Sequence, residues 1–203
     1  MRVTKKVKAE QLRRLSEVYK NDGTMLHFTS PFTLLVAVIL SAQCTDKRVN
    51  VITNRIFPRL DTPAKMVSLT QSQLETEIHD CGLYKAKAKN LLGMCRMLLS
   101  DYHGEVPEDF DELVKLPGVG RLTANVVRSV AFGYPAIAVD THVFRVANRL
   151  KLAAGTTPLE VEKGLQKAIP KEDWSAAHHW LIWHGRRVCH ARKPDCETCF
   201  LQN

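Results

Sequence analysis

The sequence predicts an all-α protein, and three features carry this prediction. Apolar residues recur at helical spacing in nearly every segment, whereas the alternation typical of strands is scarce. Pairs such as Ser30-Pro31 and Thr157-Pro158 stand directly before these periodic segments, where they favour helix starts. Glycines such as Gly104 follow such segments and favour helix ends. About ten helices are expected from this pattern.

The expected helices can be placed in chain order. They cover residues 5–20, 32–41, 46–57, a short helix from 63, a second from 71 that ends by 82, then 84–103, 111–116, 121–132, 141–150, one from 158 and a last one capped by Asp173. Residues 32–41 are apolar nearly all round and are too short to cross a membrane. We therefore expect them to form a buried central helix.

Composition limits the class of protein. At 203 residues the chain can bury the core of one compact domain or of two small lobes. A net charge of +8 favours an anionic partner, nucleic acid first, although many mildly basic proteins bind no DNA. No apolar run approaches a membrane span, and the N-terminus lacks the apolar core of a signal peptide. We expect a cytoplasmic protein with no membrane partner, in which Cys44, Cys81 and Cys95 are reduced core thiols.

Residues 116–125 read Leu-Pro-Gly-Val-Gly-Arg-Leu-Thr-Ala-Asn and predict a helix, a tight turn and a second helix. Pro117 ends the first helix, and Gly118 and Gly120 provide backbone freedom in the turn. The free N–H groups where the second helix begins, near Arg121, form a ready anion site. A lone Gly-x-Gly would indicate only a plain helical hairpin, but the longer string is far more specific.

This string resembles the helix-hairpin-helix of the endonuclease III family of base-excision DNA glycosylases. Residues 136–146, Ala-Ile-Ala-Val-Asp-Thr-His-Val-Phe-Arg-Val, resemble the segment with that family's catalytic aspartate, and the likeness runs from about residue 31 to 199. The resemblance implies a two-lobed helical fold with the active site in the cleft between the lobes. Residues 24–134 would form a six-helix lobe with the hairpin, and residues 1–23 with 135–203 a second lobe.

The resemblance also implies a partner and the residues that bind it. The partner is duplex DNA with damaged bases, bound by a monomer. The hairpin would contact the DNA backbone through Gly118, Val119, Gly120, Arg121 and Thr123. If the source is bacterial or archaeal, the cytoplasmic protein would be associated with the nucleoid.

Asp140 stands where a helix is expected to begin, so free N–H groups and the macrodipole would stabilise its carboxylate. The position alone favours an ordinary N-cap. The resemblance implies instead that Asp140 is catalytic. A fixed carboxylate favours the positive charge that builds on the sugar as an N-glycosidic bond breaks. It can also orient or deprotonate an attacking water or amine.

Leu122 departs from the family pattern. Bifunctional members carry a nucleophilic lysine here, which forms a Schiff base from which the DNA strand is cut, and leucine forms no such adduct. Three interpretations follow: a monofunctional glycosylase that uses water, an inactive or disabled relative that binds damaged DNA without turnover, and an altered copy of a bifunctional enzyme. A non-catalytic DNA-binding protein that recognises damage is the alternative from another class, and a generic hairpin-bearing DNA module with a purely structural metal site is a third option.

An enzyme that acts on a base must extrude that base and fill the gap. Gln43 resembles the family's gap-filling polar residue and Leu83 its apolar wedge, although by pattern alone they are a loop residue and a core contact. Ala37 aligns with the catalytic glutamate of adenine-specific relatives. The resemblance therefore implies a member of the branch that reads damaged pyrimidines rather than the adenine-specific branch, with oxidised pyrimidines as the expected substrates.

Cys189, Cys196 and Cys199 cluster near the C-terminus, and soft ligands at such spacing predict a metal site. The spacing resembles the family's [4Fe–4S] signature, whose fourth cysteine would stand at position 205, past residue 203. A three-iron cluster, a foreign fourth ligand, an empty site, three free thiols and a zinc site with His190 are the alternatives. A loop held by metal would present Arg192 and Lys193 to DNA phosphates.

Overall fold

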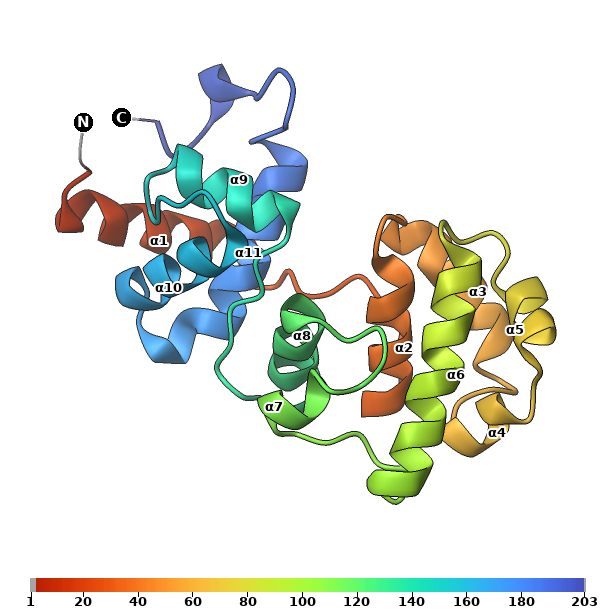
Figure 1. Ribbon diagram of the computed structural model, residues 1–203. Helices are drawn as coiled ribbons and strands as arrows, with labels where there is room; N and C mark the ends of the chain where they lie inside the picture. Colours follow the sequence, from red (N-terminus) through yellow and green to blue (C-terminus); the bar gives the residue numbers. More distant parts are fainter. Residues whose placement is uncertain (1–2, 203) are drawn as a thin grey trace. The chain divides into compact units, whose positions relative to one another are not determined.

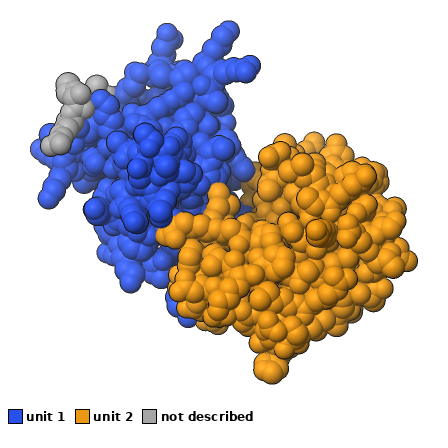
Figure 2. Space-filling model, in the orientation of Figure 1, with its two compact units in different colours: residues 1–24, 133–203 blue, residues 25–132 orange. Residues whose placement is uncertain are grey.

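The computed structural model describes residues 3–202 and contains only helices within that range (Figure 1). Eleven of these are α-helices and two are short 3-10 helices among the described residues. The all-α prediction is therefore confirmed. The chain forms two compact units, Met25–Phe132 and Met1–Thr24 with Gly133–Asn203 (Figure 2). Residues 1, 2 and 203 of the predicted second lobe lie outside the described residues.

The unit of residues 25–132 is built around one buried helix. Its helices are α2 (Pro31–Ser41), α3 (Asp46–Ile56), α4 (Pro63–Val67), α5 (Gln71–Glu77), α6 (Tyr84–Asp101), α7 (Phe110–Leu113) and α8 (Arg121–Phe132). Every residue from Phe32 to Leu40 is buried, as the apolar sequence of α2 predicts. Helices α3, α6 and α8 pack against α2 and cover it. This packing fixes the positions of the turns at both of its ends.

The other unit combines the N-terminal segment with the C-terminal part of the chain. Its helices are α1 (Lys5–Tyr19), α9 (Thr141–Arg149), α10 (Pro158–Ala168), η1 (Lys171–Asp173), α11 (Trp174–Arg187) and η2 (Cys196–Thr198). Helix α11 packs against both α1 and α9, and α10 packs against α9 (Figure 1). The start of α9 and the cysteine segment after α11 therefore share one core.

Helix starts follow the predicted caps with one exception. Ser30 accepts from the Thr33 N–H in a capping box, and Thr157 does the same with Glu160. Asp173 makes no side-chain cap bond, so the predicted cap is wrong. The helix η1 runs directly into α11, and Asp173 has αR dihedrals rather than the extended backbone that turns an N-cap side chain back toward the helix.

Candidate active site

The hairpin turn joins α7 to α8 and is anchored in the core on both sides. Leu116 and Val119 are buried, and the Val119 N–H donates to the Leu116 carbonyl at 3.0 Å. Between them, Gly118 has a φ of +80°, which L side chains rarely adopt. The turn also lies against α6: a Cβ on Gly118 would stand 3.0 Å from Cβ of Asn90. Gly118 is therefore required both by its dihedral and by its contact.

Replacing Gly118 with alanine is expected to destabilise the hairpin. The new methyl would meet Asn90 while the backbone holds a positive φ. We expect a loss of about 1–3 kcal/mol in the free energy of unfolding, because both penalties act at one residue. Denaturant unfolding of Gly118→Ala measures this loss. Gly133→Ala is the matched control, since Gly133 also has a positive φ but open space around it. An equal loss in the two variants would contradict a role for the Asn90 contact.

The predicted DNA-contacting residues of the hairpin differ in exposure. Val119 and Thr123 are buried. Arg121 is exposed, with its guanidinium over the Phe110 ring at 4.9 Å from the centroid. Gly120 has no positive φ and open space where a Cβ would stand. The structure alone thus does not require glycine at 120.

Leu122 lies in the first turn of α8, directly after the hairpin. The residue is 38% exposed. The following residues Thr123, Ala124 and Asn125 face the core. Position 122 therefore presents its side chain to solvent at a helix N-terminus.

Gln43 and Leu83 lie on two neighbouring turns, after α2 and before α6. Both are exposed and both have a positive φ, 54° for Gln43 and 60° for Leu83. A Cβ on Gly82 would stand 3.2 Å from the Gln43 carbonyl oxygen, so the two turns are in contact. Non-glycine residues in this region of φ/ψ space are strained and concentrate at functional sites. The structure thus brings these two predicted site residues together.

Asp140 is the N-cap of α9, as predicted. Its Oδ1 accepts a hydrogen bond from the Val143 N–H at 2.7 Å, and the residue is half-buried. The preceding residues 136–139 are buried, which fixes the backbone that carries the carboxylate. Asp140 is therefore a held carboxylate at the positive end of a helix.

His178 on α11 supports this segment, and sequence patterns did not single it out. The imidazole is buried, and its Nδ1–H donates to the Ala138 carbonyl at 2.7 Å. Burial lowers the pKa of His178 to about 4, so the ring is neutral near pH 7. The pair His178-His179 in the sequence was the available signal, but a pattern does not show which histidine is buried.

The buried His178 predicts a loss of stability in mild acid. Between pH 6.5 and about 4 the unfolded chain binds a proton that the folded chain excludes. The free energy of unfolding therefore falls as the pH drops through this window, by roughly 3 kcal/mol in total from this residue. Denaturant unfolding at several pH values measures the slope. The variant His178→Asn keeps a donor for Ala138 and cannot titrate, so it should make the slope shallower, while half-buried His179 and buried His184 retain part of it. An unchanged slope would assign the whole effect to other groups.

The cysteine segment is held by two arginines of α9. Arg145 Nε donates to the Cys189 carbonyl at 3.0 Å, and Arg149 donates to the carbonyls of His190 and Ala191 at 2.6 and 3.0 Å. Arg149 Nη1 also lies 3.5 Å from Cys189 Sγ. Their spacing of four residues places both arginines on one helix face, a signal that was present in the sequence.

The thiols of Cys189, Cys196 and Cys199 are chemically suited to binding a soft metal group such as an iron–sulfur cluster. All three thiols are free, with Cys189 buried, Cys199 half-buried and Cys196 exposed. Among the described residues, no three His, Cys, Asp or Glu side chains are arranged as a metal-binding set. His190 faces Asp195 at 3.3 Å, and the histidine that contacts a cysteine is His184, whose Nε2 lies 3.8 Å from Cys199 Sγ. The predicted zinc site with His190 finds no support in this arrangement.

Two basic side chains lie on the loop between Cys189 and Cys196. Arg192 and Lys193 are both exposed, and Lys193 has a φ of 50°. Further upstream, Arg187 forms an ion pair with Asp22 and stacks on Trp183 at 4.2 Å from the ring centroid. The charge of Arg187 is therefore paired with a carboxylate, although this side chain is also exposed.

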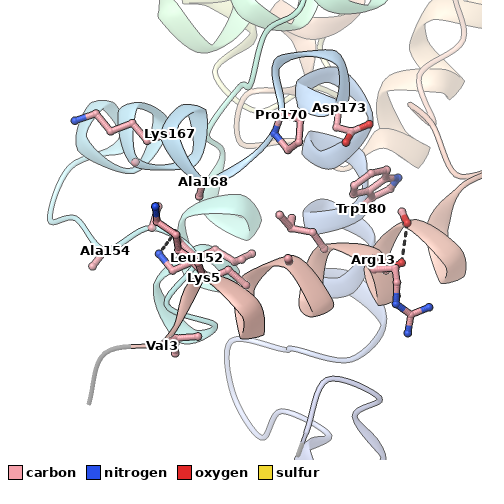
Figure 3. A pocket seen from close by; sticks show the side chains of 16 residues that line it. Val3, Lys5, Arg13, Leu152, Ala154, Lys167, Ala168, Pro170, Asp173 and Trp180 are labelled. Atoms are coloured by element: carbon pink, nitrogen blue, oxygen red, sulfur yellow. Dashed lines mark hydrogen bonds between the residues drawn. The ribbon is translucent and has the colours of Figure 1, made fainter.

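A hollow of about 780 Å³ opens between α1 and α10 (Figure 3). Lys5 and Lys167 lie on its rim, and Leu152 and Trp180 contribute apolar lining. Its size is that of many ligand sites. None of the predicted site residues lines it, so size alone does not locate the chemistry in this protein.

Comparison with known proteins identifies the family of the chain. Residues 36–171 match the HhH-GPD family, described as the HhH-GPD superfamily base excision DNA repair proteins. Residues 189–203 match the iron–sulfur binding domain of endonuclease III. The C-terminal cysteines therefore belong to an iron–sulfur binding segment. In the described part of the chain no helix is long and apolar enough to cross a membrane.

Individual relatives are similar over nearly their whole length. The chain is 50% identical to endonuclease III of Rickettsia conorii over 95% of this chain and 94% of that protein. It is 49% identical to endonuclease III of Escherichia coli over 99% and 95%. A solved structure described as a trapped endonuclease III–DNA covalent intermediate has a TM-score of 0.95 at 50% identity, covering 98% and 94%. The chain therefore belongs to the endonuclease III family of base-excision repair DNA glycosylases.

Proposed function

We propose that the chain removes oxidised pyrimidine bases from duplex DNA with water as the nucleophile and leaves the DNA strand uncut. The observation that carries this proposal is the carboxylate of Asp140, held at the start of α9 by the Val143 N–H. Solved structures of endonuclease III relatives in complex with DNA support duplex DNA as the partner.

Asp140 would act on the bond between the damaged base and the sugar. As this C–N bond breaks, the electron pair leaves with the base and positive charge builds on the sugar. A carboxylate fixed beside the sugar stabilises that charge without reorganising. Its other oxygen orients a water, which adds to the sugar carbon as its proton passes to Asp140. The departing base takes up a proton, and an abasic site remains.

Leu122 is the reason for proposing that the DNA strand stays uncut. A covalent DNA intermediate was trapped for a relative 50% identical to this chain. Such an adduct needs a nucleophile, and the hydrocarbon side chain of leucine has no amine. Position 122 is exposed in the first turn of α8, where the family resemblance places the lysine. With leucine there, base loss would not lead to strand cleavage.

The hairpin and the two strained turns would hold and open the duplex. Open space over Gly120 allows a phosphate to approach the backbone N–H groups at the start of α8, where the helix dipole also favours an anion. Gln43 and Leu83 are exposed on adjoining turns, as a pair that fills the gap left by an extruded base requires. Position 37 of α2 is a buried alanine, so it offers no carboxylate for adenine removal.

Cys189, Cys196 and Cys199 would hold the iron–sulfur cluster, and the family pattern makes it a [4Fe–4S] cluster with one further ligand. When bound, the cluster would supply rigidity to the loop between the cysteines. Arg145 and Arg149 already fix the start of this loop through backbone carbonyls. Arg192 and Lys193 on the loop would then meet DNA phosphates, which position a protein without reading sequence.

Replacing Arg192 and Lys193 together with alanine is expected to weaken duplex binding and reduce its salt dependence. Each phosphate contact releases condensed counterions, so the slope of log K against log salt should become shallower by about 1–2. Fluorescence anisotropy at several salt concentrations measures this slope. The double variant Lys5→Ala, Lys167→Ala, on the rim of the hollow, is the control. A slope equal to that of the unaltered protein would contradict a phosphate contact by this loop.

The reducing cytoplasm, with the chromosome as substrate, is the compartment we propose for this activity. Six free cysteines fit a reducing environment.

A single-turnover assay tests the proposed function. A duplex with one oxidised pyrimidine is incubated with excess protein, and each time point is divided into two samples. One sample is heated in alkali, which breaks the strand at abasic sites, and the other is left untreated. We expect breaks only after alkali. Untreated breaks would contradict the role of Leu122, and no breaks with tight binding retained would favour a lesion-binding protein without turnover.

A further inference from the structure

Lys87 on α6 has an environment that lysine rarely occupies. Its side chain is only 5% exposed, whereas Lys85 and Lys89 on the same helix are exposed. Lysines are almost never this buried unless their charge is compensated. The location of the compensating groups therefore indicates what Lys87 does.

The Nζ of Lys87 uses all of its donors. It donates to the Leu40 carbonyl at 2.8 Å, to the Ala42 carbonyl at 2.6 Å and to Cys81 Sγ at 3.1 Å. An ammonium group has three hydrogens, so the set is complete. Leu40 and Ala42 lie at the C-terminal end of α2, where carbonyls lack partners within the helix and the dipole is negative. This end of α2 thus compensates the buried charge.

These three bonds join the turn that carries Gln43 to the turn that carries Leu83. Ala42 directly precedes Gln43, and Cys81 stands two residues before Leu83. Cys81 Sγ also donates to the Leu40 carbonyl at 3.2 Å, which closes the link between the turns. Residues with a positive φ such as Gln43 and Leu83 persist only where their surroundings over-determine them. Lys87 is the charged centre of those surroundings.

We propose that Lys87 is a positioning residue that holds the Gln43 turn and the Leu83 turn in register for opening the duplex. The inference rests on the proposed function, because it deepens the role given there to these two turns. Lys87 does not replace the missing nucleophile, since its three hydrogen bonds occupy the ammonium and leave no free amine. It acts through the backbone of both turns.

The test is the variant Lys87→Met, whose unbranched side chain is one atom shorter than that of lysine and has no donors. Lys85→Met on the same helix is the matched control. A 2-aminopurine placed next to the lesion reports base opening by its fluorescence when saturating protein binds. A second probe carries the lesion in a bulge that is already unpaired, and base release is followed in the same samples.

We expect Lys87→Met to reduce opening of the paired probe by about tenfold or more, because a small misplacement of the turns is strongly amplified. The bulged probe should lose less than half of its base release, since it needs little opening. Lys85→Met should match the unaltered protein on both probes. Lys87→Arg, which keeps a charged donor, should restore much of the opening. If melting shows that Lys87→Met does not fold, Lys87→Gln replaces it in the same comparison.

Opening by Lys87→Met equal to that of the unaltered protein would overturn the inference. Equal losses on the paired and bulged probes would also overturn it, because they would indicate a general effect on stability. Absence of base release by the unaltered protein, with opening still dependent on Lys87, would contradict the proposed function and leave the positioning role supported. The positioning role of Lys87 and the proposed function can therefore be contradicted independently of each other.

Discussion

Asp140→Asn is expected to reduce base release by roughly a thousandfold while leaving the fold and duplex binding intact. Asparagine is as good an N-cap as aspartate, so the bond from the Val143 N–H at the start of α9 is kept. The variant therefore removes the negative charge and the proton acceptor with little change in stability. Single-turnover base release, read after alkali, measures the loss.

Asp140→Ala provides the control for the cap. It removes both the charge and the hydrogen-bond acceptor, and loss of an N-cap costs about 1 kcal/mol of stability. We expect Asp140→Asn to melt close to the unaltered protein and Asp140→Ala to melt lower, with base release lost in both. Base release by Asp140→Asn at the rate of the unaltered protein would show that Asp140 is only a helix cap.

Leu122→Lys is expected to convert a protein that forms no covalent adduct with DNA into one that is trapped by borohydride. The side chain at 122 is 38% exposed, so lysine fits without entering the core. The positive end of α8 disfavours an ammonium group and so favours the neutral, nucleophilic amine. Attack on the sugar then yields a Schiff base, and strand breaks should appear without alkali. Denaturing gels of borohydride-treated reactions measure both products.

Leu122→Gln is the matched control, because glutamine is polar and of similar length but has no amine. It should release base as the unaltered protein does and give no trapped adduct. If Leu122→Lys also gives no adduct while base release continues, position 122 does not lie where the nucleophile acts. The assignment of the family's lysine position to Leu122 would then be wrong.

Local patterns predicted the fold class and the helix starts because these depend on short stretches of sequence. The apolar run of α2 predicted its burial, and Ser30 and Asp140 were recognisable as caps. The cap predicted at Asp173 was wrong because a sequence pattern does not distinguish an extended N-cap residue from a 3-10 turn that continues into the helix. That difference depends on how η1 joins α11.

Sequence patterns were less informative where tertiary packing determines the role of a residue. Lys85, Lys87 and Lys89 look alike on a basic helix, yet only the structure shows that Lys87 is buried against the end of α2. His190 was the obvious histidine near the cysteines, but His184 contacts Cys199 from the end of α11. Both distinctions require contacts between residues far apart in the sequence.

The most direct test of water-mediated, Asp140-dependent base removal is the mass of the DNA itself. A duplex with one oxidised pyrimidine is incubated with excess protein, and the lesion strand is measured by mass spectrometry without alkali. We predict a full-length strand in which the lost base is replaced by a hydroxyl group, and its formation should be abolished by Asp140→Asn. A full-length strand of unaltered mass after prolonged incubation with bound protein would contradict the glycosylase, and a cleaved strand would contradict the role of Leu122.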